Sequence, residues 1–356
     1  MKQKQSQSSQ AMPSRMPKWD NLKGLLILLV VIGHFIQDGA QEQKLQIFRI
    51  LFPAIYSFHI PLFIFITGLF YKRSCNEKLK TDRIWYYLVL YILMKALLLL
   101  VKRVLTGEGS FRLLTEDGTP WYMFAMAVYL WLGYLVRYRK PQLILPMALM
   151  LGILAGYDKS IGDYLVLSRI LVFAPFFFLG YYLEPEKLTG RMERTSCKVI
   201  AAVVLGLLVL YCIVHVEDAY TYRSLMTGRN AYASCTKIPD CSGWNRLLLY
   251  GVTLLAGGAA AVCMPNRSLP LLTTIGQRSL AVYFWHRPVL YILDHYEVGN
   301  WIRQWGIRKY QVIWIGAAVL LTVICSLRIF EIPLQWLNKL CRNQIGLKST
   351  EQSGRT

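Results

Sequence analysis

The sequence predicts an all-α polytopic membrane protein with about ten transmembrane helices. Of the 356 residues, 55% are hydrophobic and only 17% are charged, and the mean hydropathy is +0.36. Soluble domains have roughly 45–50% apolar and about 25% charged residues. The apolar excess lies in long blocks such as 24–33, 61–70 and 199–214. Such blocks suit lipid, because a helix satisfies its own backbone hydrogen bonds and needs about 20 apolar residues to span a bilayer.

Apolar segments follow one another along the chain, separated by polar stretches. We expect transmembrane helices over 22–39, 47–70, 84–102, 120–136, 142–157, 164–183, 198–216, 246–264, 279–296 and 310–336. The longest polar insert, 217–246, has about 30 residues, too few for an independent core. The chain therefore divides into an N-terminal tail over 1–18, one transmembrane domain over 19–337 and a C-terminal tail over 338–356.

The net charge of +20 is spread between the apolar blocks rather than gathered in one soluble basic domain. This distribution argues against a nucleic-acid partner and predicts contact with anionic membrane lipids. Over alternate loops and span ends, 22 Lys and Arg residues fall on the side of the termini and 13 on the other side. Cytoplasmic segments hold the excess of cations, so we expect a protein of the cell membrane with both termini in the cytoplasm.

The first span carries a cation near one end and an imidazole near the other. Lys23 and His34 are eleven residues apart, which is about 16 Å along a helix and three turns, so both lie on one face. An imidazole deep in a membrane can take a proton from a hydroxyl or accept an acyl group. This face suits a molecule with an anionic head near Lys23 and a reactive end at His34. An interfacial anchor and an interhelical hydrogen bond are the structural alternatives.

The second span contains a further imidazole next to a proline. His59 lies two residues before Pro61, whose ring loosens the local helix and frees a carbonyl group. His59 is therefore either a functional residue or a structural hydrogen-bond donor beside the kink.

Two cations precede the third span. Lys80 and Arg83 are about one helical turn apart, so both can grip one phosphate group. The alternative is a solvated loop that merely obeys the positive-inside rule.

Two later spans contain polar residues within apolar sequence. Arg169 interrupts the sixth span, and a buried guanidinium needs a carboxylate, carbonyl or ligand as acceptor. His286 lies in the ninth span, directly before Arg287 and Pro288. Arg169 can also snorkel to the outer interface, and His286 can have a purely structural role.

The eight cysteines lack the spacing of a zinc site, and we expect no bound metal or cofactor. Most lie in or beside apolar segments as small packing residues. Cys235 and Cys241 differ, because they lie in the long polar loop with five residues between them. Since the charge count places this loop on the oxidising side of the membrane, the two residues are a disulfide candidate.

These motifs resemble the acyltransferase 3 family of membrane proteins. The first helix of that family carries a basic residue, ten intervening residues and a histidine, and here Lys23 and His34 hold those places. The second-helix signature is similar to residues 58–70, with Thr67 where serine is usual. The motif Lys80-x-x-Arg83, like Lys23, has a lysine where the family more often has an arginine, and 177–180 and 276–288 look like later landmarks.

The resemblance extends over residues 18–335 and favours the fucose 4-O-acetylase-like branch, which lacks an appended extracytoplasmic domain. It implies a ten-helix fold, a cytoplasmic acyl-CoA donor, usually acetyl-CoA, as co-substrate, and transfer of the acyl group to a carbohydrate hydroxyl. It also implies that His34 is catalytic and that Lys23, Lys80 and Arg83 bind the donor's phosphates. A lysine keeps the charge but not the bidentate contact of an arginine.

His59, Arg169 and His286 are then expected to position the acceptor or thioester, or to stabilise developing negative charge. A proton-coupled transporter or flippase of a sugar-linked or lipid substrate is the rival function. Against it, the chain has no visible internal repeat, and its acidic residues lie mainly in loops. Glu331 is the main exception, with Arg328 as its expected partner. A third possibility is a subunit that passes acyl groups to a separate extracytoplasmic partner.

Overall fold

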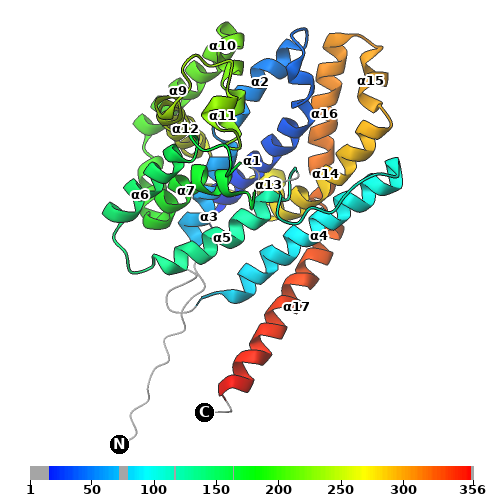
Figure 1. Cartoon of the computed structure of the whole chain (residues 1–356). Coiled ribbons are helices and arrows are strands. Elements are labelled where there is room, and N and C mark those ends of the chain that lie inside the picture. The colour runs from blue at the N-terminus through cyan, green and yellow to red at the C-terminus, as the bar shows by residue number, and fades with distance from the viewer. Residues whose placement is uncertain (1–15, 72–78, 116–117, 163, 354–356) are drawn as a thin grey trace, which may run out of the picture.

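The computed structural model describes residues 16–71, 79–115, 118–162 and 164–353, without the side chains from 344 on. These residues form helices and no strand, and one isolated bridge joins Thr115 to Tyr164 (Figure 1). The elements in chain order are α1 (Pro17–Ile36), η1 (Gly39–Gln41), α2 (Gln46–Tyr56), α3 (His59–Tyr71), α4 (Thr81–Thr106), α5 (Trp121–Leu135), α6 (Pro141–Leu154), α7 (Leu167–Tyr182), α8 (Pro185–Met192), α9 (Thr195–Val214), α10 (Val216–Thr221), α11 (Arg223–Met226), η3 (Tyr232–Ser234), α12 (Gly243–Cys263), α13 (Pro270–Gln277), α14 (Ser279–His295), α15 (Val298–Arg303), α16 (Ile307–Cys325) and α17 (Arg328–Ser353).

Helix lies in each segment predicted to cross the membrane. Within the described part of the chain, six helical segments have the length and apolar composition of a span. The helices α7 and α8 add a seventh if this pair, bent by 92°, is one span, while α5 and α6 are apolar but shorter. The all-helical prediction is confirmed, and the number of about ten spans stays a prediction.

The second predicted span is broken between α2 and α3, at the kink that Pro61 predicts. Pro61 has no N–H to offer the carbonyl group of Ser57, four residues earlier. That carbonyl instead accepts a hydrogen bond of 2.6 Å from the Thr253 hydroxyl of α12. This hydrogen bond joins α12 to the break between α2 and α3. The helix α3 begins after the break, at His59.

The prediction of a single span over 310–336 is wrong. The helix α16 ends at Cys325 and α17 begins at Arg328. Between them, the carbonyl group of Ser326 accepts a hydrogen bond of 2.9 Å from Arg278. The guanidinium thus satisfies a carbonyl group that has no partner within the helix at the C-terminal end of α16. The helix α17 then runs on beside α4 (Figure 1), so the expected tail boundary at 337 falls inside a helix.

Glycines allow two helix pairs to pack backbone against backbone. A Cβ atom at Gly68 of α3 would overlap the backbone of α7, and one at Gly180 of α7 would overlap that of α3. The same reciprocal contact joins α1 to α13 through Gly24 and Gly276. Small residues permit this close approach between helices in lipid.

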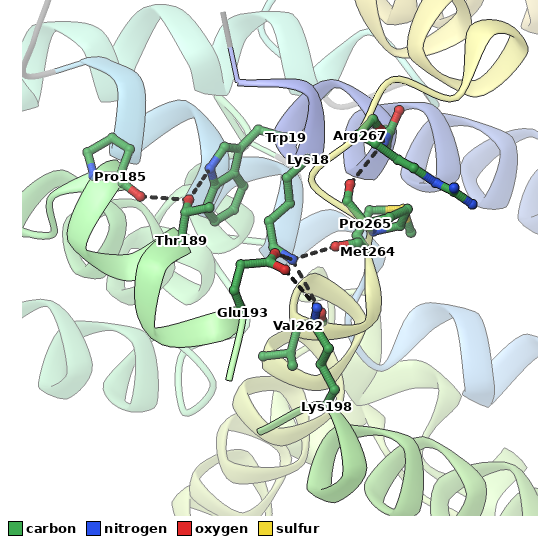
Figure 2. Close-up of polar contacts among 11 residues, drawn as sticks. Lys18, Trp19, Pro185, Thr189, Glu193, Lys198, Val262, Met264, Pro265 and Arg267 are labelled. Atoms are coloured by element: carbon green, nitrogen blue, oxygen red, sulfur yellow. Dashed lines mark hydrogen bonds and ion pairs between the residues drawn. The ribbon is translucent and has the colours of Figure 1, made fainter. Parts of the chain in front are cut away.

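A buried lysine anchors the start of α1 (Figure 2). Lys18 is 0% exposed and lies inside the helix rather than in the expected tail. Its ammonium group forms an ion pair of 3.0 Å with Glu193 and donates to the carbonyl groups of Val262, at 3.2 Å, and Met264. Glu193 also bonds Lys198, at 2.7 Å. A buried charge with this many partners fixes the position of its helix.

Neighbouring residues complete the anchor. The indole of Trp19 donates to the hydroxyl of Thr189 in α8, at 3.0 Å. The Asn21 amide donates to the carbonyl groups of Pro265 and Arg267, at 3.1 and 2.8 Å. The helix that carries the predicted donor-binding lysine and catalytic histidine is therefore held by α8, by Glu193 directly after it, by α12 and by the loop after α12 (Figure 2).

Candidate active site

The C-terminal part of α1 borders a cavity of about 290 Å³, termed the imidazole cavity. His34 and His59 both line it, and so does Arg169 from the first turn of α7. The remaining wall includes aromatic, hydroxyl and amide groups, such as Tyr56 and Gln37. Three residues that the sequence singles out on separate helices thus meet at one cavity.

The third predicted imidazole lies against the first. The ring of His286 in α14 stacks on that of His34, with the ring centroids 5.3 Å apart and an interplanar angle of 29°. The buried Nδ1 of His34 and the buried Nε2 of His286 have no hydrogen-bond partner among the described residues. Buried polar atoms are nearly always paired, so the Nδ1 of His34, which lines the imidazole cavity, marks a place for a polar ligand, whereas the fully buried His286 is not in the cavity wall.

Backbone carbonyl groups fix the tautomers of the two other imidazoles. The Nδ1 atom of His59 lies 2.8 Å from the Ile55 carbonyl, and that of His286 lies 3.0 Å from the Val282 carbonyl. Since a carbonyl group only accepts hydrogen bonds, both Nδ1 atoms carry the hydrogen. In the neutral rings, each Nε2 atom is therefore an acceptor.

Two arginines place positive charge beside the histidines. The guanidinium of Arg169 lies 4.5 Å from the centroid of the Trp121 ring. Arg169 and Arg287 are both close enough to act electrostatically on His34, and Arg287 is held over the Tyr291 ring, 4.9 Å from its centroid. The sequence does not single out Arg287 as a site residue, although its place directly after His286 is a signal that could have done so.

The first part of α1 borders a second cavity, of about 490 Å³, termed the cationic cavity. Its wall includes the predicted Lys23 and Arg83, and also Arg278 and Arg342. Glu331 is the one carboxylate among the described residues that line it. Cations therefore predominate, which suits an anionic ligand such as a phosphate group.

Several of these cations have a carboxylate partner. Glu331 lies 3.2 Å from the guanidinium of Arg278. The sequence predicts Arg328 as its partner, and this prediction is wrong. Lys23 lies 2.7 Å from Asp20. The exposed Arg342 lies 3.6 Å from Asp82. These pairs hold the side chains in place at the cavity wall.

Lys80 does not join Arg83 in that wall. It lies directly before α4, as the residue that caps this helix, whereas Arg83 lies in the first turn. Arg83 but not Lys80 lines the cationic cavity. Of the two neighbouring cations only Arg83 lines the cavity, and their joint binding of one phosphate group stays a prediction.

A chain of side-chain contacts runs from the cationic cavity to the imidazole cavity. Thr67 lines the cationic cavity and donates to the carbonyl group of Phe63, at 3.1 Å. The Phe63 ring lies 6.4 Å, centroid to centroid, from that of Tyr122, which lies 5.2 Å from that of Tyr283 in the wall of the imidazole cavity.

The two loop cysteines lie next to each other as free thiols. Cys235 is buried and Cys241 is partly buried, the two pack in one small cluster, and the Cys235 thiol donates to the carbonyl group of Ala231, at 3.5 Å. Burial, followed by the neighbouring Cys241, raises the pKa of the Cys235 thiol to about 11. The disulfide stays a prediction.

A family described as an acyltransferase domain, the acyltransferase 3 family, matches residues 16–331. The chain belongs to this acyltransferase family. The match runs from the start of α1 into α17 and includes both the lysine and the histidine of the first span. No curated protein and no solved structure matches the chain.

The acyltransferase match also includes the other predicted site residues, and Arg342 lies beyond it. The sequence does not single out Arg278 or Arg342. Arg278 reads as an ordinary loop cation, and Arg342 lies in the segment predicted to be a tail. The signal that could have found Arg278 is its place inside the landmark 276–288.

Proposed function

We propose that this protein is an O-acyltransferase that transfers an acetyl group from acetyl-CoA to a carbohydrate hydroxyl. The fucose 4-O-acetylase-like resemblance favours acetyl as the group and a sugar as the acceptor. In this proposal the protein lies in the cell membrane with both termini in the cytoplasm. The cationic cavity then faces the cytoplasm, where acyl-CoA is found.

One observation carries the proposal: Lys23 and His34, on a single helix, line two separate polar cavities. The cationic cavity suits the phosphates of coenzyme A, and the imidazole cavity suits proton transfer at a hydroxyl group. Eleven residues of helix separate the two by about 16 Å. A long donor with a phosphate-bearing head and a thioester tail fits this arrangement.

Lys23 and Arg83 bind the donor's phosphates in this account, together with Arg278 and Arg342. The ammonium group of Lys23 acts as a point charge, while each guanidinium offers paired donors to phosphate oxygens. The role of Lys80 is electrostatic, from its place beside the first turn of α4.

His34 is the general base in the transfer step. Its Nδ1 takes the proton of the acceptor hydroxyl while that oxygen attacks the carbonyl carbon of the thioester. The tetrahedral intermediate then breaks its C–S bond, and the proton returns from the imidazolium to the departing thiolate. The products are the O-acetyl ester and free coenzyme A.

The other predicted residues assist this step. The guanidinium of Arg169 stabilises the negative charge that develops on the thioester oxygen. His59 offers an Nε2 acceptor that orients a hydroxyl group of the acceptor, and His286 positions the ring of His34 by stacking on it.

The first test is consumption of acetyl-CoA by the purified protein in liposomes, with wild type and His34→Ala compared. We expect the variant to lose about 100-fold or more of the rate, because a general base contributes at least that much. His295→Ala is the matched control, since His295 is an exposed histidine at the end of α14. If His34→Ala turns over acetyl-CoA like wild type, the proposal fails, and if wild type neither binds nor consumes acetyl-CoA, transport becomes the leading function.

A further inference from the structure

An apolar groove of about 770 Å³ lies between α9 and α12. Its wall includes Val204, Leu207 and Leu210 of α9, and Val252 and Leu255 of α12. The side chains of Leu207 and Leu255 are 60% and 63% exposed, so the groove opens toward the lipid. Its walls and opening suit a hydrocarbon chain that enters from the bilayer.

The groove and the imidazole cavity meet at Met226. It occupies the C-terminal half of α9 and the first half of α12, which lie beside the short helices α10 and α11 (Figure 1). Met226 of α11 lines both the groove and the imidazole cavity. Its neighbour Tyr222 lines the groove, and Arg223 lines the cavity. One lipid can therefore place its chain in the groove and its head group in the cavity.

The cavity side of this junction is positively charged. Arg223 and Arg229 line the imidazole cavity beside Met226, and Arg169 lines its wall from α7. Arg223 is oriented by its 3.1 Å hydrogen bond to the Tyr220 hydroxyl. No Asp or Glu is among the described residues that line this cavity. Its charge complements a phosphate group at the point where a chain leaves the groove.

We infer that the acceptor is a lipid-linked saccharide, joined to its lipid through phosphate. Its chain lies in the α9–α12 groove, its phosphate at Arg223 and Arg229, and its sugar hydroxyl at His34. This inference rests on the proposed acyl transfer and names the acceptor's class. The transfer step is unchanged: the sugar oxygen gains the acyl group, the C–S bond breaks, and the hydroxyl proton passes through His34 to coenzyme A.

The test uses polyprenyl diphosphate–glucose with a photoreactive diazirine in its lipid chain, added to liposomes that contain the full-length protein. Phosphatidylcholine with the same diazirine is the comparison lipid. We expect the glycolipid to label peptides of α9 and α12 in preference to phosphatidylcholine. Arg223→Gln should reduce this labelling about tenfold, the loss of one charge-assisted hydrogen bond.

Val204→Trp narrows the groove and should also reduce glycolipid labelling. Val203→Trp is the matched control, since Val203 is an exposed neighbour on α9 that does not line the groove. Equal labelling by both lipids, unchanged by Val204→Trp and Arg223→Gln, would overturn the inference.

Acetyl-CoA consumption, measured in the same liposomes, separates this inference from the proposed function. If consumption depends on His34 but labelling is not selective, the acyltransferase stands and the lipid-linked acceptor is wrong. If labelling is selective but acetyl-CoA is not consumed, the groove is a glycolipid site and the proposed transfer is wrong.

Discussion

At the scale of single residues, the site depends on charges and imidazoles that lipid would otherwise exclude. Among the described residues, the Nδ1 of His34 has no hydrogen-bond partner, yet its ring lies against His286 and near two arginines. Such an arrangement costs free energy in a membrane unless a ligand uses it. In the cationic cavity, Lys23 and Arg83 belong to a wall in which cations predominate, although Lys23 has Asp20 as its partner.

Donor binding should respond to the individual cations. We expect Lys23→Ala and Arg83→Ala each to raise KM for acetyl-CoA about tenfold, because each removes one charge-assisted contact to phosphate. Lys80→Ala is the matched variant and should change KM much less, since Lys80 lies outside the cavity wall. Steady-state kinetics measures all three, and an equal effect of Lys80→Ala would contradict this description of the cavity.

The sequence predicts some of these residues and misses others for a physical reason. His34, His59 and Arg169 are recognisable because a polar side chain in an apolar span is costly, and all three line one cavity. Arg278 and Arg342 carry no such signal, because a loop or tail cation is ordinary in a membrane protein. Only the packing of α13 and α14 against α1, and of α17 against α14 and α4, brings them to the cavity that Lys23 lines.

At the scale of helices, prolines and glycines explain where the spans bend and how closely they pack. Pro61 predicts the break between α2 and α3 from the sequence alone. The break between α16 and α17 has no such local cause, because the guanidinium at Ser326 comes from Arg278, which is distant in sequence and lies between α13 and α14. A prediction from hydropathy alone therefore joins α16 and α17 into one span, because the contact that separates them is tertiary.

The close contact of α3 and α7 should not tolerate a methyl group. We expect Gly68→Ala and Gly180→Ala each to lower the free energy of unfolding by about 1–3 kcal/mol, as overpacking does. The control is Gly206→Ala in α9, where an added Cβ meets nothing within 4 Å. Thermal unfolding in detergent measures the three, and a Gly68→Ala protein as stable as wild type would contradict the observed packing.

The anchor of α1 should depend on pH through Glu193. Hydrogen bonds from Lys198 and Lys18 hold the pKa of the Glu193 carboxyl below its ordinary value. Its contribution to stability is therefore complete above the ordinary carboxyl pKa, about 4.3, and is lost as the pH falls through the lower folded value. We expect Glu193→Gln to lower the melting temperature near neutral pH, and the difference from wild type to shrink in acid.

Glu184→Gln is the control for this pH dependence. The ion pair of Glu184 with Lys187 is exposed on both sides, and such pairs contribute little. A Glu193→Gln difference that stays constant from neutral pH to acid would contradict the proposed anchor.

At the scale of the whole molecule, the two cavities lie along one central helix. The helix α1 packs against α13, α14 and α16, so its two ends are surrounded by the bundle. Donor and acceptor can then approach from opposite ends of α1 and meet within the protein. The sequence correctly predicts that Lys23 and His34 lie on one continuous helix, three turns apart.

The orientation of α1, and so of the protein, across the membrane can be measured directly. In a cysteine-free protein that is still active, Lys237→Cys should react with a membrane-impermeant maleimide on intact cells. Arg191→Cys should react only after the cells are permeabilised, because the charge count places it in the cytoplasm. The reverse pattern would turn the protein over and place the cationic cavity away from cytoplasmic acyl-CoA.

The most direct test of the central claim measures binding and turnover of acetyl-CoA separately in the same variant. If the cationic cavity binds the donor and His34 acts on its far end, His34→Ala should bind acetyl-CoA with the Kd of wild type and release no coenzyme A. Arg83→Ala should bind weakly and still turn over at saturating donor. A His34→Ala protein that has lost acetyl-CoA binding, or that still releases coenzyme A, would contradict the claim that the cationic cavity binds the donor and His34 catalyses the transfer.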